Sequence, residues 1–293
     1  MLIAGKLQHV MVYAHYSREG SIPKYLSICL QRALEVVDRV VLVAAGEPVA
    51  SLPTELLGRV ELICRQNLGW DFASYRDGLL VARKYEPERL TLCNDSVYGP
   101  LFPLQEAFDA MEGRADAWGM TASSELWWHL QSYFLSFSPA VVAADAFWDF
   151  WVTVPNDATR RDVIRNGEIR LSQKLLDVGF LLESYCTPPP HGESFSGLQK
   201  IQRLFGTARK RWRDPMLYQD LMDVVARGAR LGANPSLVYW PTLIGEQRLP
   251  FVKRAVVANP GGLDTLMYSM DRCTGGMCSD VLDVIREDVE YGL

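Results

Sequence analysis

Short apolar runs alternate with segments of helical periodicity over the first third of the chain. Four of these runs have the length of buried strands, at residues 9–15, 40–45, 60–64 and 90–93. Residues 23–38 carry leucine and valine at helical spacing, and a second helical segment follows Asn67-Leu68-Gly69. Strands that alternate with helices form mostly parallel sheets with helices on both faces. The pattern therefore predicts an α/β fold built on a doubly wound, mostly parallel sheet.

Polar residues gather where two of the expected strands end. Asn67-Leu68-Gly69 is a turn after the third strand, and Asp71 is placed to cap the following helix. Asn94-Asp95-Ser96 follows the fourth strand directly, ahead of Gly99-Pro100. In open α/β sheets, ligands bind at the carboxyl ends of the strands. We therefore expect a ligand site at this edge of the sheet.

An aromatic-rich run at residues 126–137 follows a further expected strand at residues 117–121. The run mixes rings with hydrogen-bonding groups, among them Trp128, His129 and Gln131. Such a surface suits a sugar, whose C–H face stacks on rings while its hydroxyls need polar partners. The same composition also suits a core segment, and both interpretations remain open.

Glu168 marks a second place where chemistry is expected. It follows Gly167 and opens a predicted amphipathic helix with leucines at helical spacing, which Gly179 ends as a C-cap. A first-turn carboxylate either stabilises the helix dipole or stands at the mouth of a site as a general base.

The pattern changes at Pro188-Pro189-Pro190, which predicts a boundary between a core at residues 1–187 and a mainly helical extension at residues 188–293. Six basic residues and no acidic one occur between Lys200 and Arg213; they contact anionic lipid, bind a phosphorylated acceptor or form a solvated helix face.

Lys253 and Arg254 lie in an apolar segment, where they either neutralise a phosphate or extend their charged ends to solvent.

Composition narrows the possible functions. The chain of 293 residues is 48% hydrophobic and 22% charged, as in ordinary globular proteins, and its net charge of -5 gives no reason to expect nucleic acid as a partner. Six scattered cysteines without CxxC spacing argue against a zinc site or a disulfide framework and favour the cytoplasm. Glycine-rich dinucleotide and P-loop motifs and the serine-hydrolase elbow are absent.

The order of these features resembles the GT-A type of glycosyltransferase, and more closely the rhamnan synthesis F family of bacterial polysaccharide biosynthesis. The residues that carry the closer resemblance are Asn67-x-Gly69-x-Asp71-Phe72, the run Asn94 to Pro100, Trp118 to Thr121, His129 to Phe134, Asn234-Pro235 and Pro250 to Arg254. The resemblance implies a GT-A-like fold and an enzyme that transfers a deoxyhexose such as rhamnose from a nucleoside diphosphate to a growing cell-surface polysaccharide or lipopolysaccharide O-antigen, with inversion.

The resemblance also implies roles for particular residues. Glu168 is the expected catalytic base. The residues expected at the nucleotide-sugar donor are Asn67, Gly69, Asp71, Asn94, Asp95, Ser96, Lys253 and Arg254, and those expected at the glycan or lipid-linked acceptor are Thr121, Trp128, His129 and Gln131. A divalent cation, Mg²⁺ or Mn²⁺, would rest on Asp95, the one carboxylate of the triplet; the alternative source of charge is Lys253 or Arg254.

Two further expectations complete the interpretation. The protein is expected in the cytoplasm, with peripheral contact to the inner face of the plasma membrane through Lys200 to Arg213. Because Asn94-Asp95-Ser96 retains a single carboxylate, the alternative function is a catalytically silent glycan- or nucleotide-binding module of a larger polysaccharide synthase.

Overall fold

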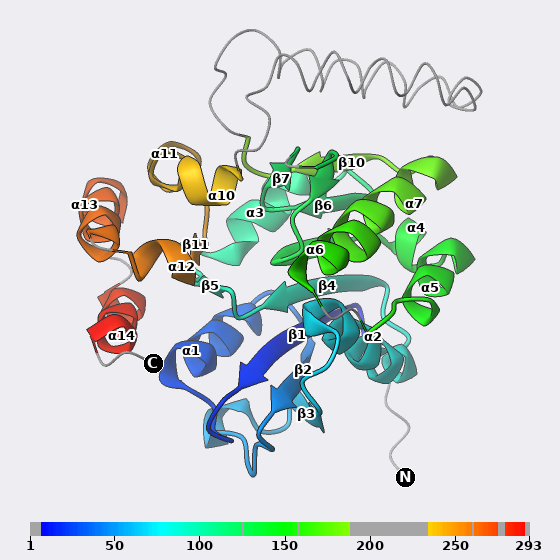
Figure 1. Ribbon diagram of the computed structural model, residues 1–293, viewed down its shortest axis with the longest axis horizontal. Helices are drawn as coiled ribbons and strands as arrows, with labels where there is room; N and C mark the ends of the chain where they lie inside the picture. Colours follow the sequence, from blue (N-terminus) through cyan, green and yellow to red (C-terminus); the bar gives the residue numbers. More distant parts are fainter. Residues whose placement is uncertain are drawn as a thin grey trace, which may run out of the picture.

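A seven-stranded sheet forms the centre of the protein (Figure 1). The computed structural model describes residues 7–124, 126–156, 159–187, 234–259, 261–274 and 279–290. The sheet consists of β1 (His9–Ser17), β2 (Arg39–Gly46), β3 (Val60–Arg65), β4 (Arg89–Asn94), β6 (Ala117–Gly119), β9 (Phe134–Phe137) and β10 (Leu182–Ser184). Its spatial order is β10-β6-β9-β4-β1-β2-β3, and only β9 runs antiparallel to its neighbours.

The sheet confirms the predicted fold class, a mostly parallel sheet with helices on both faces. Side chains along β1 alternate between the faces, as in any pleated strand. Val10 and Val12 belong to one core cluster with residues of α2 (Trp70–Ala82), whereas Met11 and Tyr13 belong to another with residues of α1 (Lys24–Ala33). All four of these side chains are at most 1% exposed, which explains why the strand has no polar alternation in its sequence.

The remaining helices complete the two layers. They are α3 (Leu104–Met111), α4 (Pro139–Val142), α5 (Asp145–Val152), α6 (Arg160–Val163) and α7 (Arg170–Val178), with the short 3-10 turns η1 (Thr54–Leu56) and η2 (Arg83–Tyr85). The helix expected at residues 23–38 stops at Ala33. The carbonyls of Leu34 and Val37 beyond it accept hydrogen bonds from the guanidinium of Arg59, so the chain satisfies its backbone without continuing the helix.

The described C-terminal elements are mostly helical and are coloured yellow to red in Figure 1, where the last of them lies beside α1. They are α10 (Pro235–Val238), α11 (Trp240–Gln247), α12 (Arg254–Val257), α13 (Gly262–Thr274) and α14 (Ser279–Glu290). Ion pairs from Lys24 to Glu287 and from Arg32 to Asp280 join α1 to α14. Among the described helices, none is both long and apolar enough to cross a membrane.

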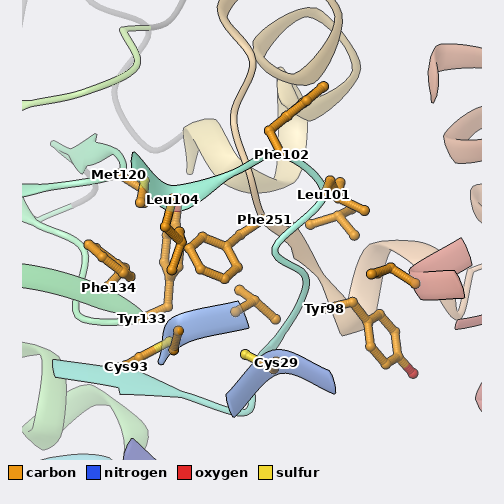
Figure 2. Packing of buried hydrophobic residues seen from close by; sticks show 14 of the residues in the cluster. Cys29, Cys93, Tyr98, Leu101, Phe102, Leu104, Met120, Tyr133, Phe134 and Phe251 are labelled. Carbon is orange, nitrogen blue, oxygen red and sulfur yellow. The ribbon is translucent and has the colours of Figure 1, made fainter. Parts of the chain in front are cut away.

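A two-residue strand connects this C-terminal part to the sheet edge. β11 (Val252–Lys253) pairs antiparallel with β5 (Val97–Tyr98), just beyond β4. Next to it, the ring of Phe251 packs among Tyr133 and Phe134, with ring centroids 6.4 and 5.5 Å away (Figure 2). Burial of this aromatic group holds the two-residue strand in place, because so short a strand has few hydrogen bonds of its own.

Candidate functional site

The carboxyl ends of β1 and β4 bring the first polar residues together. Asn94 ends β4, and Asp95 follows it. Asp95 Oδ2 accepts hydrogen bonds from Nδ1 of His15, 2.8 Å away, and from the backbone N–H of Tyr16, 2.7 Å away. Both donors belong to β1, which pairs in parallel with β4. The polar edge expected from the sequence therefore forms, with Asp95 fixed to its neighbouring strand.

Asn94 joins the two polar motifs to each other. Its Nδ2 donates to Asp71 Oδ2 at 2.9 Å, and its Oδ1 accepts from the N–H and the hydroxyl of Ser96 at 3.1 and 2.6 Å. The prediction that Asp71 caps the helix is wrong: Gly69 occupies the cap position and makes no side-chain bond, while Asp71 lies inside the first turn and faces Asn94.

The turn before α2 depends on glycine. Gly69 has φ +76°, and a Cβ there would lie 2.6 Å from the Cβ of Ala73 and 2.9 Å from the Cα of Asn156. Only glycine accepts this conformation and this close approach. Asn67, two residues earlier, is exposed in the turn. The turn thus lets α2 begin where Asp71 faces Asn94.

Lys253 reaches the same cluster from the C-terminal part of the chain. Its Nζ donates to the Ser96 hydroxyl at 2.9 Å and lies 4.3 Å from the ring centroid of Tyr133. The β5–β11 pairing sets this position by matching Lys253 with Val97. Gly99 permits the close approach, because a Cβ there would meet the carbonyl oxygen of Pro250 at 2.3 Å.

The cluster shifts the protonation of its own members. Burial raises the pKa of the Asp71 carboxyl to about 7, and the charge of Asp95 adds to this while Lys253 opposes it. Burial lowers the pKa of the Lys253 ammonium to about 8, against the attraction of Glu168 and Asp71. Perturbed carboxyl and amino groups that influence one another are typical of functional sites.

Glu168 is a further carboxyl near this cluster, because its charge influences both Asp71 and Lys253. It lies in the π-helical segment Ile164–Ile169, between α6 and α7, so the prediction that it opens a helix is wrong, and the alternative role at a helix dipole does not apply. The helical run begins earlier, because Thr159 caps α6 by accepting a hydrogen bond from the N–H of Asp162. A π-helical turn inside a longer helix is often found at functional sites.

Ser132 and His129 hold the Glu168 carboxylate. Its Oε1 accepts from the N–H and hydroxyl of Ser132 at 2.8 and 2.7 Å, and its Oε2 lies 3.5 Å from Nε2 of His129. Burial alone raises the pKa of this carboxyl, but the bonds and charge of His129 and the bonds of Ser132 outweigh it, so the pKa is lowered. Glu168 is therefore ionised at neutral pH.

The other residues expected at the acceptor are deeply buried. The Thr121 hydroxyl donates to Gln131 Oε1 at 2.7 Å, and Gln131 Nε2 donates to Asn234 Oδ1 at 3.1 Å. Thr121 is 0% exposed and Gln131 4%. Trp128 packs in the core cluster on the α2 face of the sheet. Of these residues only His129 touches Glu168; the aromatic run is largely core in this structure.

Arg254 is engaged away from the triplet. Its guanidinium bonds to the hydroxyl of Tyr25 at 2.8 Å and to Asp288 at 3.1 Å, and it also packs over the ring of Tyr98. These contacts join α12 to α1 and α14. The side chain of Lys253 thus contacts the polar triplet, whereas the guanidinium of Arg254 bonds to Tyr25 and Asp288 instead.

The fit of the triplet to a divalent cation is poor. In the described ranges, no three His, Cys, Asp or Glu side chains are grouped as a metal site. Asp95 Oδ2 already accepts two hydrogen bonds, Asn94 and Ser96 are bonded to each other, and the Lys253 ammonium lies against Ser96. Mg²⁺ and Mn²⁺ need available oxygen ligands and a local excess of negative charge. Several oxygens of the triplet are therefore already engaged, and the ammonium offsets negative charge beside Ser96.

A family model places the chain among known proteins. The model of rhamnan synthesis protein F matches residues 45–200, which include Asp71, the Asn94-Asp95-Ser96 triplet and Glu168. The chain belongs to the rhamnan synthesis protein F family. The family resemblance inferred from the sequence is thereby confirmed, and the clustered residues of this family member lie mostly within the matched segment.

Individual relatives of this family member cover it less completely. It is 34% identical over 148 residues to the uncharacterized protein y4gN of Sinorhizobium fredii, which covers 47% of this chain and 38% of y4gN, so the match spans well under half of that relative. It is 26% identical over 218 residues to the virulence protein VirA of Vibrio anguillarum, covering 72% of this chain and 67% of VirA. The structure of the inositol-1-phosphate CTP transferase from T. maritima aligns at 14% identity with a TM-score of 0.38, over 62% of this chain and 86% of that one.

Several residues of the cluster escaped the sequence analysis. His15 ends a predicted strand, so its place at the carboxyl end of that strand could have indicated that it belongs to the polar sheet edge. Ser132 and Tyr75, whose hydroxyl donates to the Ser132 carbonyl at 2.8 Å, carry no comparable pattern. The predicted boundary at Pro188 and the basic run from Lys200 to Arg213 lie outside the described residues.

Proposed function

We propose that this chain is an inverting glycosyltransferase that moves a sugar from a nucleoside diphosphate to a growing cell-surface polysaccharide or lipopolysaccharide O-antigen. The proposed sugar is a deoxyhexose such as rhamnose, in keeping with the family. The observation that carries the proposal is the meeting of Asp71, Asp95, Glu168 and Lys253 at one edge of the sheet, since the charges of these groups interact.

The positively charged and the negatively charged groups have different proposed roles. A diphosphate leaving group needs a positive partner, and Lys253 lies beside the triplet where the donor is expected. An acceptor hydroxyl needs a proton acceptor, and Glu168 is ionised and fixed by Ser132 and His129. Asn67, Gly69 and Asp71 would line the nucleotide side of the donor.

In the proposed reaction the acceptor oxygen attacks the anomeric carbon as the bond from that carbon to the diphosphate breaks. The electron pair of the broken bond leaves on the diphosphate, and the hydroxyl proton passes to Glu168. A single displacement of this kind inverts the anomeric configuration. Residues 1–187 would form the donor-binding and catalytic core and residues 188–293 would complete the acceptor side, with the reaction on the cytoplasmic face of the membrane.

Product analysis tests the function. The purified chain is incubated with a panel of nucleotide sugars and a lipid-linked glycan acceptor, and nucleotides and glycans are separated. Glycosyl transfer releases a nucleoside diphosphate in step with acceptor extension. Release of sugar 1-phosphate instead, with the nucleotidyl group passed to the acceptor, would identify a nucleotidyltransferase, and no turnover of any donor would overturn the proposal.

A second candidate is a catalytically silent glycan- or nucleotide-binding module of a larger synthase. The observation that favours it is the triplet itself, in which Asn94 and Ser96 replace carboxylates. Thermal-shift measurements separate the two functions. Stabilisation by a glycan together with no response to UDP, GDP or dTDP would support the module.

A further inference from the structure

The charge beside the polar triplet belongs to a lysine side chain. Of the three residues Asn94, Asp95 and Ser96 at the end of β4, two are neutral. Ser96 Oγ donates to Asn94 Oδ1 at 2.6 Å and accepts from Lys253 Nζ at 2.9 Å. The hydroxyl is therefore already bonded on both sides.

Asp95 is similarly committed. Its Oδ2 accepts from His15 Nδ1 and from the N–H of Tyr16, so its orientation is set by β1. The ammonium of Lys253, which donates to the hydroxyl of Ser96, would repel a divalent cation bound beside that residue because like charges at such separations disfavour each other. Two features thus oppose metal binding at this place: the hydrogen bonds that Asn94 Oδ1, Asp95 Oδ2 and Ser96 Oγ already make, and the nearby ammonium.

The lysine is held in position by the short strand pair that joins the C-terminal part to the sheet edge. β11 has two residues, and its pairing with β5 places Lys253 opposite Val97. The Pro250 carbonyl also accepts a hydrogen bond from the N–H of Leu101 at 2.7 Å. On its other side the ammonium faces the ring of Tyr133 at 4.3 Å, an arrangement that favours the charged form.

We propose that Lys253 takes the place of a divalent cation and stabilises the departing diphosphate, so that donor binding and sugar transfer by this chain are independent of metal. The inference rests on the proposed function for its substrate. When the bond between the anomeric carbon and the diphosphate breaks, the electron pair passes to the phosphate oxygen, and the Lys253 ammonium binds that oxygen by a charge-assisted hydrogen bond without giving up its proton.

The protonation state of the lysine agrees with this role. Burial lowers its pKa to about 8, so the side chain is mostly charged at neutral pH. A bound diphosphate adds negative charge next to it and favours the charged form further. The groups that face the ammonium are Glu168, Asp71 and Ser96, and the charge of Arg160 opposes it.

Calorimetric titration with inorganic pyrophosphate, UDP, GDP and dTDP tests the inference. Each probe is titrated into the wild-type chain in EDTA and in Mn²⁺, and into Lys253→Ala and Lys253→Arg. We expect at least one probe to bind with the same Kd in both buffers. Lys253→Ala should weaken that binding by about tenfold to a hundredfold, as expected for a lost bond to a charged group, and Lys253→Arg should restore most of it.

Controls and outcomes separate this inference from the proposed function. Lys174→Ala, which removes an exposed lysine of α7, should bind as wild type, and thermal unfolding establishes that each variant is folded. Binding that requires Mn²⁺, or that is unchanged in a folded Lys253→Ala variant, would overturn the inference and leave the function standing. Metal-free, Lys253-dependent binding without any transfer would support the diphosphate site and count against the enzyme. If no probe binds in either buffer, both are wrong.

Discussion

Asn94 donates a hydrogen bond to Asp71 across 2.9 Å and so joins the end of β4 to the first turn of α2. The carboxyl of Asp71, which accepts this bond, is partly buried and lies near the charge of Asp95. A neutral amide at position 94 is suited to this place, because a second carboxylate there would face Asp71 directly and repel it.

The first prediction concerns the pH dependence of stability. Asp71 has a raised pKa of about 7 in the folded chain. Its protonated form therefore stabilises the fold fully below the unfolded pKa, about 4, and this contribution is lost as the pH rises toward 7. Asp71→Asn should remove a slope of up to about 1.4 kcal/mol per pH unit from the free energy of unfolding between pH 5 and 6.5. Urea unfolding of both proteins across this range measures the difference, and parallel curves would show that Asp71 titrates normally.

The second prediction concerns Glu168 as the base. Glu168→Gln keeps the shape of the side chain and its bonds to Ser132 can largely persist, but the amide does not accept a proton. Transfer should fall by about 10²–10⁴-fold while nucleotide binding changes little. Initial rates and calorimetry measure the two effects. Glu112→Gln, at an exposed residue paired with Arg89, is the matched control. Full transfer activity in Glu168→Gln would remove the base assignment.

The third prediction concerns the packing that positions Glu168. Gly167 lies against Phe72, the residue after Asp71, and a Cβ on it would be 2.7 Å from the ring. Gly167→Ala should therefore destabilise the fold by about 1–3 kcal/mol. Phe72→Leu on the same background should recover part of the loss if this contact is responsible. Denaturant unfolding of the wild type, both single variants and the double variant gives the coupling energy; strictly additive effects would contradict the packing explanation.

The fourth prediction distinguishes two roles of Arg254. If its bonds to Asp288 and Tyr25 are what matter, Arg254→Ala should lower the free energy of unfolding by about 3–5 kcal/mol, because it leaves the buried Asp288 without its charged partner. Adding Asp288→Asn should recover part of that loss. Unfolding and nucleotide binding are measured together. Wild-type stability combined with weakened nucleotide binding would instead assign Arg254 to the donor.

Local patterns in the sequence predicted the central sheet well. The first four expected strands form, each longer than predicted by one or two residues, and β3, β2, β1 and β4 pair in parallel. The strand expected at residues 117–121 also forms but is shorter, Ala117–Gly119. The reason is physical: strands buried on both faces must be apolar throughout, and this requirement is visible in a single segment. The polar triplet after β4 could be placed at the sheet edge by the same reasoning.

The contacts of individual side chains depended on residues that are distant in the sequence, which a local sequence pattern does not show. Trp128 and His129 are adjacent in the sequence, yet the first packs in the core and the second contacts Glu168. Lys253 and Arg254 likewise separate, one toward Ser96 and the other toward Asp288. Adjacent side chains point in different directions, so composition alone does not assign them.

The sequence by itself determined the parallel sheet, the polar edge at Asp71 and the Asn94-Asp95-Ser96 triplet, and the family resemblance. Only the tertiary structure decided which charged side chain contacts the triplet. Lys253 lies 157 residues from Ser96 in the chain, on a strand of two residues whose position depends on the burial of Phe251. A contact of that kind is decided by packing between distant segments, and no periodicity within either segment encodes it.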